Sequence, residues 1–362
     1  MAEIKKIDWY IAKKFILTFF LAMLLIIVIV IIFDLSEKID NFVKNEAPLK
    51  EIVFDYYGNF IPYFINMFSG MFVFITVIFF TSRMASNSEI IAILSCGVSF
   101  KRMMVPYIVT AVLIALLSIG LNLFVIPQAN STRLEFEAKY VKRHNTYNLR
   151  DIHYQISPGQ FVYIESFSRW NNTAYKFTIE DMDGHRLTRK VSAETAVWDT
   201  TMDGWHLRKV FTREYTAGLQ DRVVYKENVD TVIALKIKDL FNNEKTVETL
   251  PARALSDLIS TQKMRGDKNV MYAQIEQQRR LAIPFSAIIL TIIGVSLSAR
   301  KRRGGIGWNI GLGIAIAFSY ILFLRLSEMF VYTDTLPPVI ALWLPNLLYT
   351  GIAAFLFKKA SQ

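Results

Sequence analysis

The chain has 362 residues, 53% of them hydrophobic, with a mean hydropathy of +0.31 and a net charge of +10 at pH 7. Such a chain is too apolar for an ordinary soluble domain, which indicates an integral membrane protein. Its one cysteine, Cys96, excludes an internal disulfide bond, and its four histidines show no spacing typical of metal ligands, so we expect no metal and no other cofactor.

Six stretches without charged residues are long enough to cross the hydrocarbon layer of a bilayer, which is ~30 Å thick and takes about 20 residues. The first should persist as a helix, because its apolar run is longer than that of a signal peptide and no small-residue cleavage site follows it. In chain order the stretches are 15–33, 58–82, 103–126, 281–299, 304–324 and 335–357.

Lysine and arginine near the ends of the spans predict the orientation of the chain. If the N-terminus is cytoplasmic, the segments on that side carry the whole excess of positive charge, and the rest of the chain is neutral. The net charge is therefore a topology signal, and nucleic-acid binding is not needed to explain it. We expect a multi-pass protein of the bacterial inner membrane with both termini in the cytoplasm.

A long polar segment separates the third span from the fourth. Within it, short runs of alternating apolar and polar residues are separated by the turn dipeptides Pro158-Gly159, Asp183-Gly184 and Asp203-Gly204. This pattern predicts six or more antiparallel strands in a small sandwich or jelly roll.

After these strands, residues 251–280 have the pattern of a helical hairpin around Gly266. The predicted fold class is an α-helical polytopic membrane protein with six transmembrane helices, arranged 3+3, and an inserted periplasmic all-β jelly-roll-like domain. Its predicted parts are 1–135 with the first three spans, 136–250 with the β domain, and 251–362 with a helical connector and the last three spans.

The link between the second and third spans contains a short predicted helix within 87–97. Asn87 and Ser88 can cap a helix that begins at Glu89, whose carboxylate suits the positive end of that helix, and Gly97 ends it. The apolar run between them is too short to cross the membrane. It is either an interfacial re-entry loop or an amphipathic helix that docks on a peripheral protein at the cytoplasmic face; an acidic residue is unusual in the former.

Two further motifs lie in the fifth span. Gly307 and Gly311 form a GxxxG pattern typical of close helix packing. Arg325 and Glu328 lie one turn apart near the outer interface, either as a snorkelling ion pair or as a phosphate contact, for which guanidinium geometry is well suited. Lys38, just beyond the first span, is a second phosphate candidate.

The second span has an aromatic and methionine face that includes Phe64 and Phe68. Such a face either packs against other helices or forms a wall for acyl chains of variable shape. Pro62 predicts a kink in this span. The chain has no GxxxxGK[ST] motif, so we do not expect it to hydrolyse ATP itself.

Several segments together resemble the lipopolysaccharide export permeases LptF and LptG (the YjgP/YjgQ family), over about residues 7–357 and with slightly more likeness to LptG. The segment after the first span, FDLSEKID, is more acidic than expected for a phosphate-lined entrance. The matching segments are SEIIAILSCGVSFKRM, which resembles the family's coupling helix, IDWYIAKKFILTFF, GQFVYIES, QQRRLAIPFSAIILTIIG and ALWLPNLLYTGIAAFLF.

This resemblance implies a half-transporter that pairs with a second permease of the same family and is powered by a cytoplasmic ABC ATPase dimer. It implies extraction of lipopolysaccharide from the outer leaflet of the inner membrane and its transfer to periplasmic jelly-roll bridge proteins. The residues that it suggests for ATPase coupling are Ser88, Glu89, Gly97 and Arg102. For the substrate it suggests Lys38, Phe64, Phe68 and Arg325, and for a gate against the partner's first helix Gly307 and Gly311.

Three other functions stay open. A lipoprotein-release ABC permease usually has four spans with its large domain after the first, which the insertion after the third disfavours. A membrane-anchored periplasmic scaffold or sensor would not bind an ATPase through the loop around Glu89. A membrane-embedded enzyme would need paired carboxylates or a His/Asp/Glu cluster within the spans, and the sequence shows neither.

Overall fold

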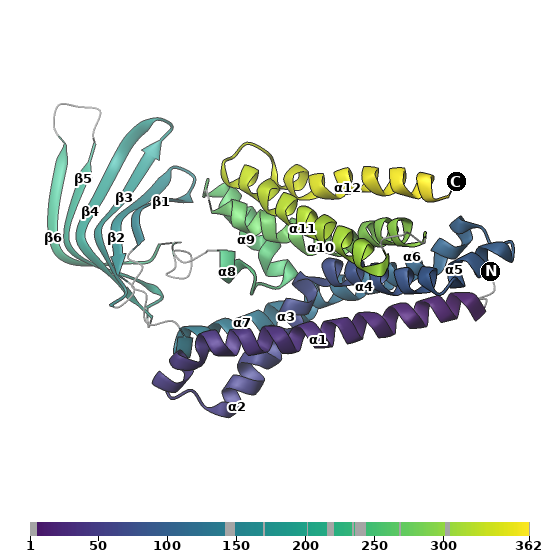
Figure 1. Ribbon diagram of the computed structural model, residues 1–362. Coiled ribbons are helices and arrows are strands. Elements are labelled where there is room, and N and C mark those ends of the chain that lie inside the picture. The colour runs from purple at the N-terminus through teal and green to yellow at the C-terminus, as the bar shows by residue number, and fades with distance from the viewer. Residues whose placement is uncertain are drawn as a thin grey trace. The chain divides into compact units, whose positions relative to one another are not determined.

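The computed structural model describes residues 6–141, 149–168, 171–200, 202–215, 221–233, 235, 244–267, 269–300 and 305–361 (Figure 1). The chain divides into two compact units. We call Met1–Val141, Glu248–Ala252 and Gln274–Gln362 the membrane unit, and Lys142–Val247 with Arg253–Ala273 the β unit.

Within the described residues, six helices are long and apolar enough to cross a membrane, which confirms the predicted number of spans. The third continues past α6 through a π-helical turn, Leu121–Val125, into α7 (Ile126–Phe136) and a second π-helical turn, Glu137–Val141. The six are α1 (Lys6–Lys44), α4 (Ser69–Ser86), α6 (Phe100–Gly120) with its continuation, α10 (Val270–Ser298), α11 (Gly305–Tyr332) and α12 (Pro338–Ala360).

The second predicted span is two helices, α3 (Gly58–Met67) and α4, rather than one helix kinked at Pro62. Pro62 lies inside α3, and the break falls at Phe68, whose φ of −103° and ψ of 9° are not helical. The short α2 (Leu49–Glu51) and the π-helical turn Ile52–Tyr57 precede α3.

Helix α4 lies at the centre of the membrane unit, and most of its side chains are buried. Two glycines of other helices approach it closely. A Cβ on Gly313 of α11 would lie 2.2 Å from Ile78 Cδ1, and one on Gly294 of α10 would lie 3.1 Å from Val77. By contrast, most of α1 is exposed within the chain, and its outward face is apolar, as expected for a helix that faces lipid or a partner.

The β unit contains a six-stranded antiparallel sheet in which each strand pairs with its neighbour in sequence (Figure 1). This β domain between the third and fourth spans confirms the predicted fold class, but the described strands form one sheet in sequence order rather than the two sheets of the predicted sandwich or jelly roll. All three predicted turn dipeptides lie at the ends of strands. The strands are β1 (Leu149–Ser157), β2 (Gln160–Ser168), β3 (Thr173–Asp183), β4 (Arg186–Asp199), β5 (Gly204–Glu214) and β6 (Arg222–Thr231).

One face of this sheet carries an aromatic core. Trp205 is fully buried, lies 5.2 Å from Trp198 between ring centroids, and donates a hydrogen bond from Nε1 to the carbonyl oxygen of Leu235 at 2.9 Å. The short α8 (Glu244–Val247) and α9 (Ala252–Met264) follow the strands. A turn at Gly266, whose φ is +64°, separates α9 from α10 at the predicted position.

Candidate functional site

The link between α4 and α6 folds into a short helix, α5 (Glu89–Ser95). Its ends are set by two left-handed residues, Ser88 with a φ of +60° and Gly97 with a φ of +83°. The predicted helix start at Glu89 is confirmed, but the predicted cap is wrong in part: the side chain of Ser88 makes no capping hydrogen bond. The reason is its backbone, because a capping residue normally has extended rather than left-handed angles.

The carboxylate of Glu89 is bound by two residues of α1. Lys14 Nζ lies 3.2 Å from Oε1 and 3.0 Å from Oε2, and the hydroxyl of Tyr10 donates to Oε2 at 2.9 Å. Asn87 Nδ2 lies 3.5 Å from Oε1. Partial burial is the largest influence on the pKa of Glu89 and raises it, but the hydrogen bonds from Lys14, Tyr10 and Asn87 outweigh it and hold the pKa below its ordinary value.

A second ion pair joins α1 to the segment that follows α5. Arg102, near the start of α6, binds Asp8 with both guanidinium NH groups, at 2.7 and 2.6 Å. Ser99 caps α6 by accepting a hydrogen bond from the backbone N–H of Arg102 at 3.3 Å. The first turns of α1 therefore hold both ends of the connection through α5. They do so with charge-assisted hydrogen bonds, which are stronger than those between neutral groups.

The side chains of α5 differ in exposure. Ile90 is buried in the core formed with α1, α4 and α6. Ile91 and Leu94, its neighbours on the helix surface, are 52% and 39% exposed. A short helix that is anchored by one buried side chain and leaves aliphatic side chains exposed has the properties of a docking element.

A charge network, buried apart from the half-exposed Arg325, lies at the opposite end of the membrane unit and is formed by Glu248, Glu276, Arg279, Arg325 and Glu328. Glu328 is only 3% exposed and accepts hydrogen bonds from Arg279 at 3.1 Å and from Arg325 at 2.9 Å. Arg279 also lies 3.6 Å from Glu248 and 3.6 Å from Glu276. The predicted pair of Arg325 and Glu328 is thus present, and it is part of a larger network across α10 and α11.

Lys38, the other cation predicted to contact substrate, belongs to a separate cluster. Its Nζ lies 2.6 Å from Asp34 Oδ1 and 4.0 Å from Glu137, and it donates to the hydroxyl of Tyr56. Tyr56 also donates to Asp34. Lys38 is therefore neutralised within the chain, whereas Arg325 has a side chain that is 49% exposed.

Phe64 and Phe68 stand in a row of aromatic rings that runs along α3 and crosses the break into α4. The ring centroids of Phe60 and Phe64 are 5.7 Å apart, those of Phe64 and Phe68 are 4.7 Å apart, and those of Phe68 and Phe72 are 6.3 Å apart. Phe64 and Phe68 are partly buried against the core of the membrane unit. Part of each ring therefore packs against the core, and part stays exposed.

Of the glycines in α11, the predicted GxxxG pair has open space around it. A Cβ on Gly307 or Gly311 would meet no atom within 4 Å among the described residues. Packing within the described part of the chain relies instead on Gly313, which contacts Ile78. The GxxxG face is therefore available for a helix from outside the chain.

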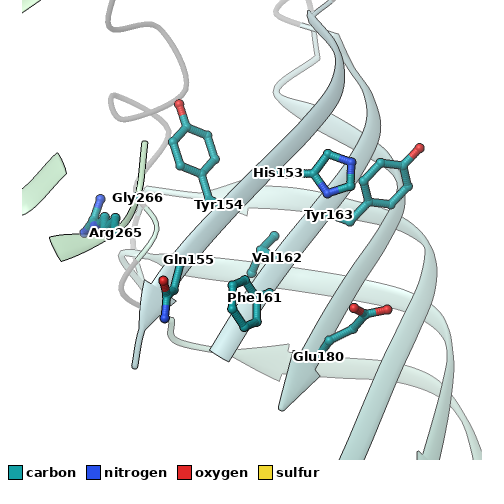
Figure 2. Close-up of a pocket in the computed structure, with 9 residues that line it drawn as sticks. All are labelled: His153, Tyr154, Gln155, Phe161, Val162, Tyr163, Glu180, Arg265 and Gly266. Carbon is teal, nitrogen blue, oxygen red and sulfur yellow. The ribbon is translucent and has the colours of Figure 1, made fainter. Parts of the chain in front are cut away.

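The β unit has a cavity of about 510 Å³ where strands β1–β3 approach the turn Arg265-Gly266. Figure 2 shows its side chains, with His153 and Tyr163 next to each other on neighbouring strands, their ring centroids 4.6 Å apart. Glu180 at its edge is paired with Lys190 at 2.7 Å. The described residues contain no group of His, Cys, Asp and Glu able to hold a metal ion, in this cavity or elsewhere.

Several residues of these sites were not among those predicted from the sequence. Lys14, Tyr10 and Asp8 could not be predicted, because each is separated from its partner by 75 or more positions in the sequence. Arg279 had a signal in the sequence, since it and Arg280 stand directly before the charge-free stretch 281–299. A charged residue at such a position is often part of a buried pair.

One comparison with known proteins gives a result. The family model described as "Lipopolysaccharide export system permease LptF/LptG" matches residues 9–359, nearly the whole chain. A comparison with curated proteins gives no match.

Proposed function

The chain belongs to the lipopolysaccharide export permease family LptF/LptG, and on that premise we propose that it is one half of an ABC-type exporter. It is a multi-pass inner-membrane protein and a transporter subunit rather than an enzyme. In the proposed complex it pairs with a second permease of the family, and a separate cytoplasmic ATPase dimer supplies the energy. Lipopolysaccharide leaves the outer leaflet of the inner membrane and passes to a periplasmic bridge.

The family match carries this proposal, and the geometry of α5 supports the coupling step. Ile91 and Leu94 offer an apolar contact to the ATPase, while Ile90 fixes the helix to the core. We assign Ser88, Glu89, Gly97 and Arg102, the residues expected from the sequence, to the same coupling region. On this proposal both termini and α5 are cytoplasmic, and the β unit is periplasmic.

For the substrate, we propose that Arg325 contacts a lipid A phosphate and that Phe64 and Phe68 contact acyl chains. Arg325 suits this role because Glu328, itself held by Arg279, orients the guanidinium while half of the side chain stays exposed. Lys38 is the weaker candidate, because Asp34 and Glu137 already compensate its charge. The open face of Gly307 and Gly311 supports a contact with the partner permease.

The β unit is proposed to pass lipopolysaccharide onward. Strands β1 and β6 are the edges of the described sheet, and an edge strand can be extended by a strand of another chain. Bridge proteins with similar sheets could continue from one of these edges.

The proposal is tested by reconstitution of the chain in proteoliposomes with its partner permease and the ATPase. We expect ATP-dependent release of lipopolysaccharide to a soluble bridge protein, and we expect Glu89→Lys to insert normally but to abolish release. Photo-crosslinkers at Arg325 and Phe64, with Phe124 on the outer surface of the third span as a matched control, should capture lipopolysaccharide in cells. No capture from either position, with functional chain in the membrane, would favour the scaffold alternative.

A further inference from the structure

The atoms around Glu89 are already occupied by the chain itself. Both oxygens of the carboxylate accept hydrogen bonds from α1, one from Lys14 alone and the other from Lys14 and Tyr10. An acidic side chain that served mainly to bind another protein would leave its acceptor positions open to that protein. Here the binding positions are directed at α1 instead.

The second ion pair places the same constraint on the other end of α5. Arg102 and Asp8 form a bidentate ion pair, whose two hydrogen bonds oppose rotation of the two side chains as well as their separation. Asp8, Tyr10 and Lys14, near the start of α1, thus hold the connection through α5, which is exposed on its outer side. Any displacement of α5 must either break these contacts or move the end of α1.

Helix α1 is suited to carry such a displacement. It has 39 residues in one unbroken helix, which corresponds to a length of about 58 Å. One side of it packs on the core through Ile11, Phe15, Phe19 and Met23, so the helix can move only together with that contact, while its outward face is exposed within the chain. Its far end carries Asp34 and Lys38, in the cluster with Tyr56.

We infer that Lys14 and Tyr10 are positioning residues that tie the coupling helix α5 to α1, and that Glu89 acts chiefly through this tie rather than by binding the ATPase. The inference rests on the proposed function, and it adds the route by which movement of α5 reaches a membrane helix. In this arrangement the apolar residues Ile91 and Leu94 bind the partner, and the two ion pairs transmit its movement to α1.

A charge exchange separates the two roles of Glu89. Lys14→Glu should leave the ATPase bound and hydrolysing ATP, while lipopolysaccharide released per ATP falls about tenfold, because two carboxylates now face each other. The double variant Lys14→Glu with Glu89→Lys restores the pair in reverse and should recover most of the release. Lys13→Glu is the matched control, since it makes the same charge change one residue away on an exposed position.

The result that would overturn the inference is equally definite. If Glu89 acts by contacting the ATPase, Lys14→Glu alone will be active and the exchanged double variant will be as inactive as Glu89→Lys. At the second pair, Asp8→Arg alone should likewise lower the lipopolysaccharide released per ATP. The double variant Asp8→Arg with Arg102→Asp should recover it.

A second measurement keeps the tie independent of the proposed function. A carbodiimide reagent joins a lysine amine to a carboxylate only when the two are in contact, and mass spectrometry of the purified full chain should find Lys14 joined to Glu89. Lys13 should not be joined to it. Absence of the Lys14 product overturns the tie whatever the transport assay shows, whereas its presence in a chain without ATP-driven release would refute the exporter role alone.

Discussion

Replacing Arg279 with methionine should destabilise the membrane unit far more than the same change at Arg325. Both arginines bind Glu328, but Arg279 is 13% exposed and Arg325 is 49% exposed. Arg279 lies 3.1 to 3.6 Å from three carboxylates, and its loss leaves them without their shared cation in a buried setting. Breaking a buried ionic network in this way costs ~3–5 kcal/mol, whereas an exposed pair contributes ~0–1 kcal/mol.

The assay is an unfolding titration of the purified chain in mixed micelles, followed by tryptophan fluorescence, which gives the free energy of unfolding of each variant. Adding Glu328→Leu to Arg279→Met should recover part of the loss, because it removes a buried carboxylate that would otherwise keep only the half-exposed Arg325 as its partner. A loss below about 1 kcal/mol for Arg279→Met, or an equal loss for Arg325→Met, would show that the network is not the buried, mutually compensated unit described above.

Two glycine replacements test close contacts in the two units. Gly313→Val should lower the free energy of unfolding by ~1–3 kcal/mol because its Cβ would lie 2.2 Å from Ile78 Cδ1, and Ile78→Ala should offset this in the same titration. Gly159→Ala should open the β1–β2 hairpin in hydrogen exchange, because its φ is +78° and its Cβ would lie 2.6 Å from the carbonyl oxygen of Met182. Gly184→Ala, with a φ of +59° and open space, should cost only ~1–2 kcal/mol. An unchanged free energy of unfolding for Gly313→Val would contradict the contact with Ile78. Equal hydrogen-exchange protection of the β1–β2 hairpin in Gly159→Ala and the β3–β4 hairpin in Gly184→Ala would contradict the contact with Met182.

The membrane spans and the strands could be predicted because each follows from a strong physical constraint. A bilayer requires about 20 apolar residues per helix, and a half-buried strand requires alternation, so both leave a pattern that is visible in the sequence. Gly266 could be identified as a turn for a similar reason, since it separates two helical patterns. The positive φ of this residue bears out that prediction.

The break at Phe68 could not be predicted in the same way. Proline is the usual signal for a kink, and the nearest one, Pro62, lies inside a regular part of α3. Nothing in the side chain of Phe68 disfavours a helix. The pair Ser69-Gly70, which follows directly, is a weaker signal for a break than a proline, and Gly70 also lies in close contact with Ser286.

The candidate site also combines features that have a local sequence pattern with features that depend on the fold. The position of α5 could be predicted because an acidic residue, a short apolar run and a glycine occur in order, and the helix starts at Glu89 as expected. The partners of Glu89 could not be predicted, because many lysines are present and only the fold selects Lys14. A long-range pair of this kind has no local signature in one sequence.

The neighbour-to-neighbour order of the sheet in the β unit has a consequence for how the chain is made. Each strand pairs with the one synthesised just before it, so the sheet needs only short loop closures and should form quickly as it emerges. The contact of Gly294 with Val77, by contrast, joins helices on either side of the β insertion and must wait for α10. The β unit should therefore fold before the helix bundle closes, in the order typical of domains folding during synthesis. A substitution that slows the sheet would lower the yield of the whole permease, although it touches no membrane helix.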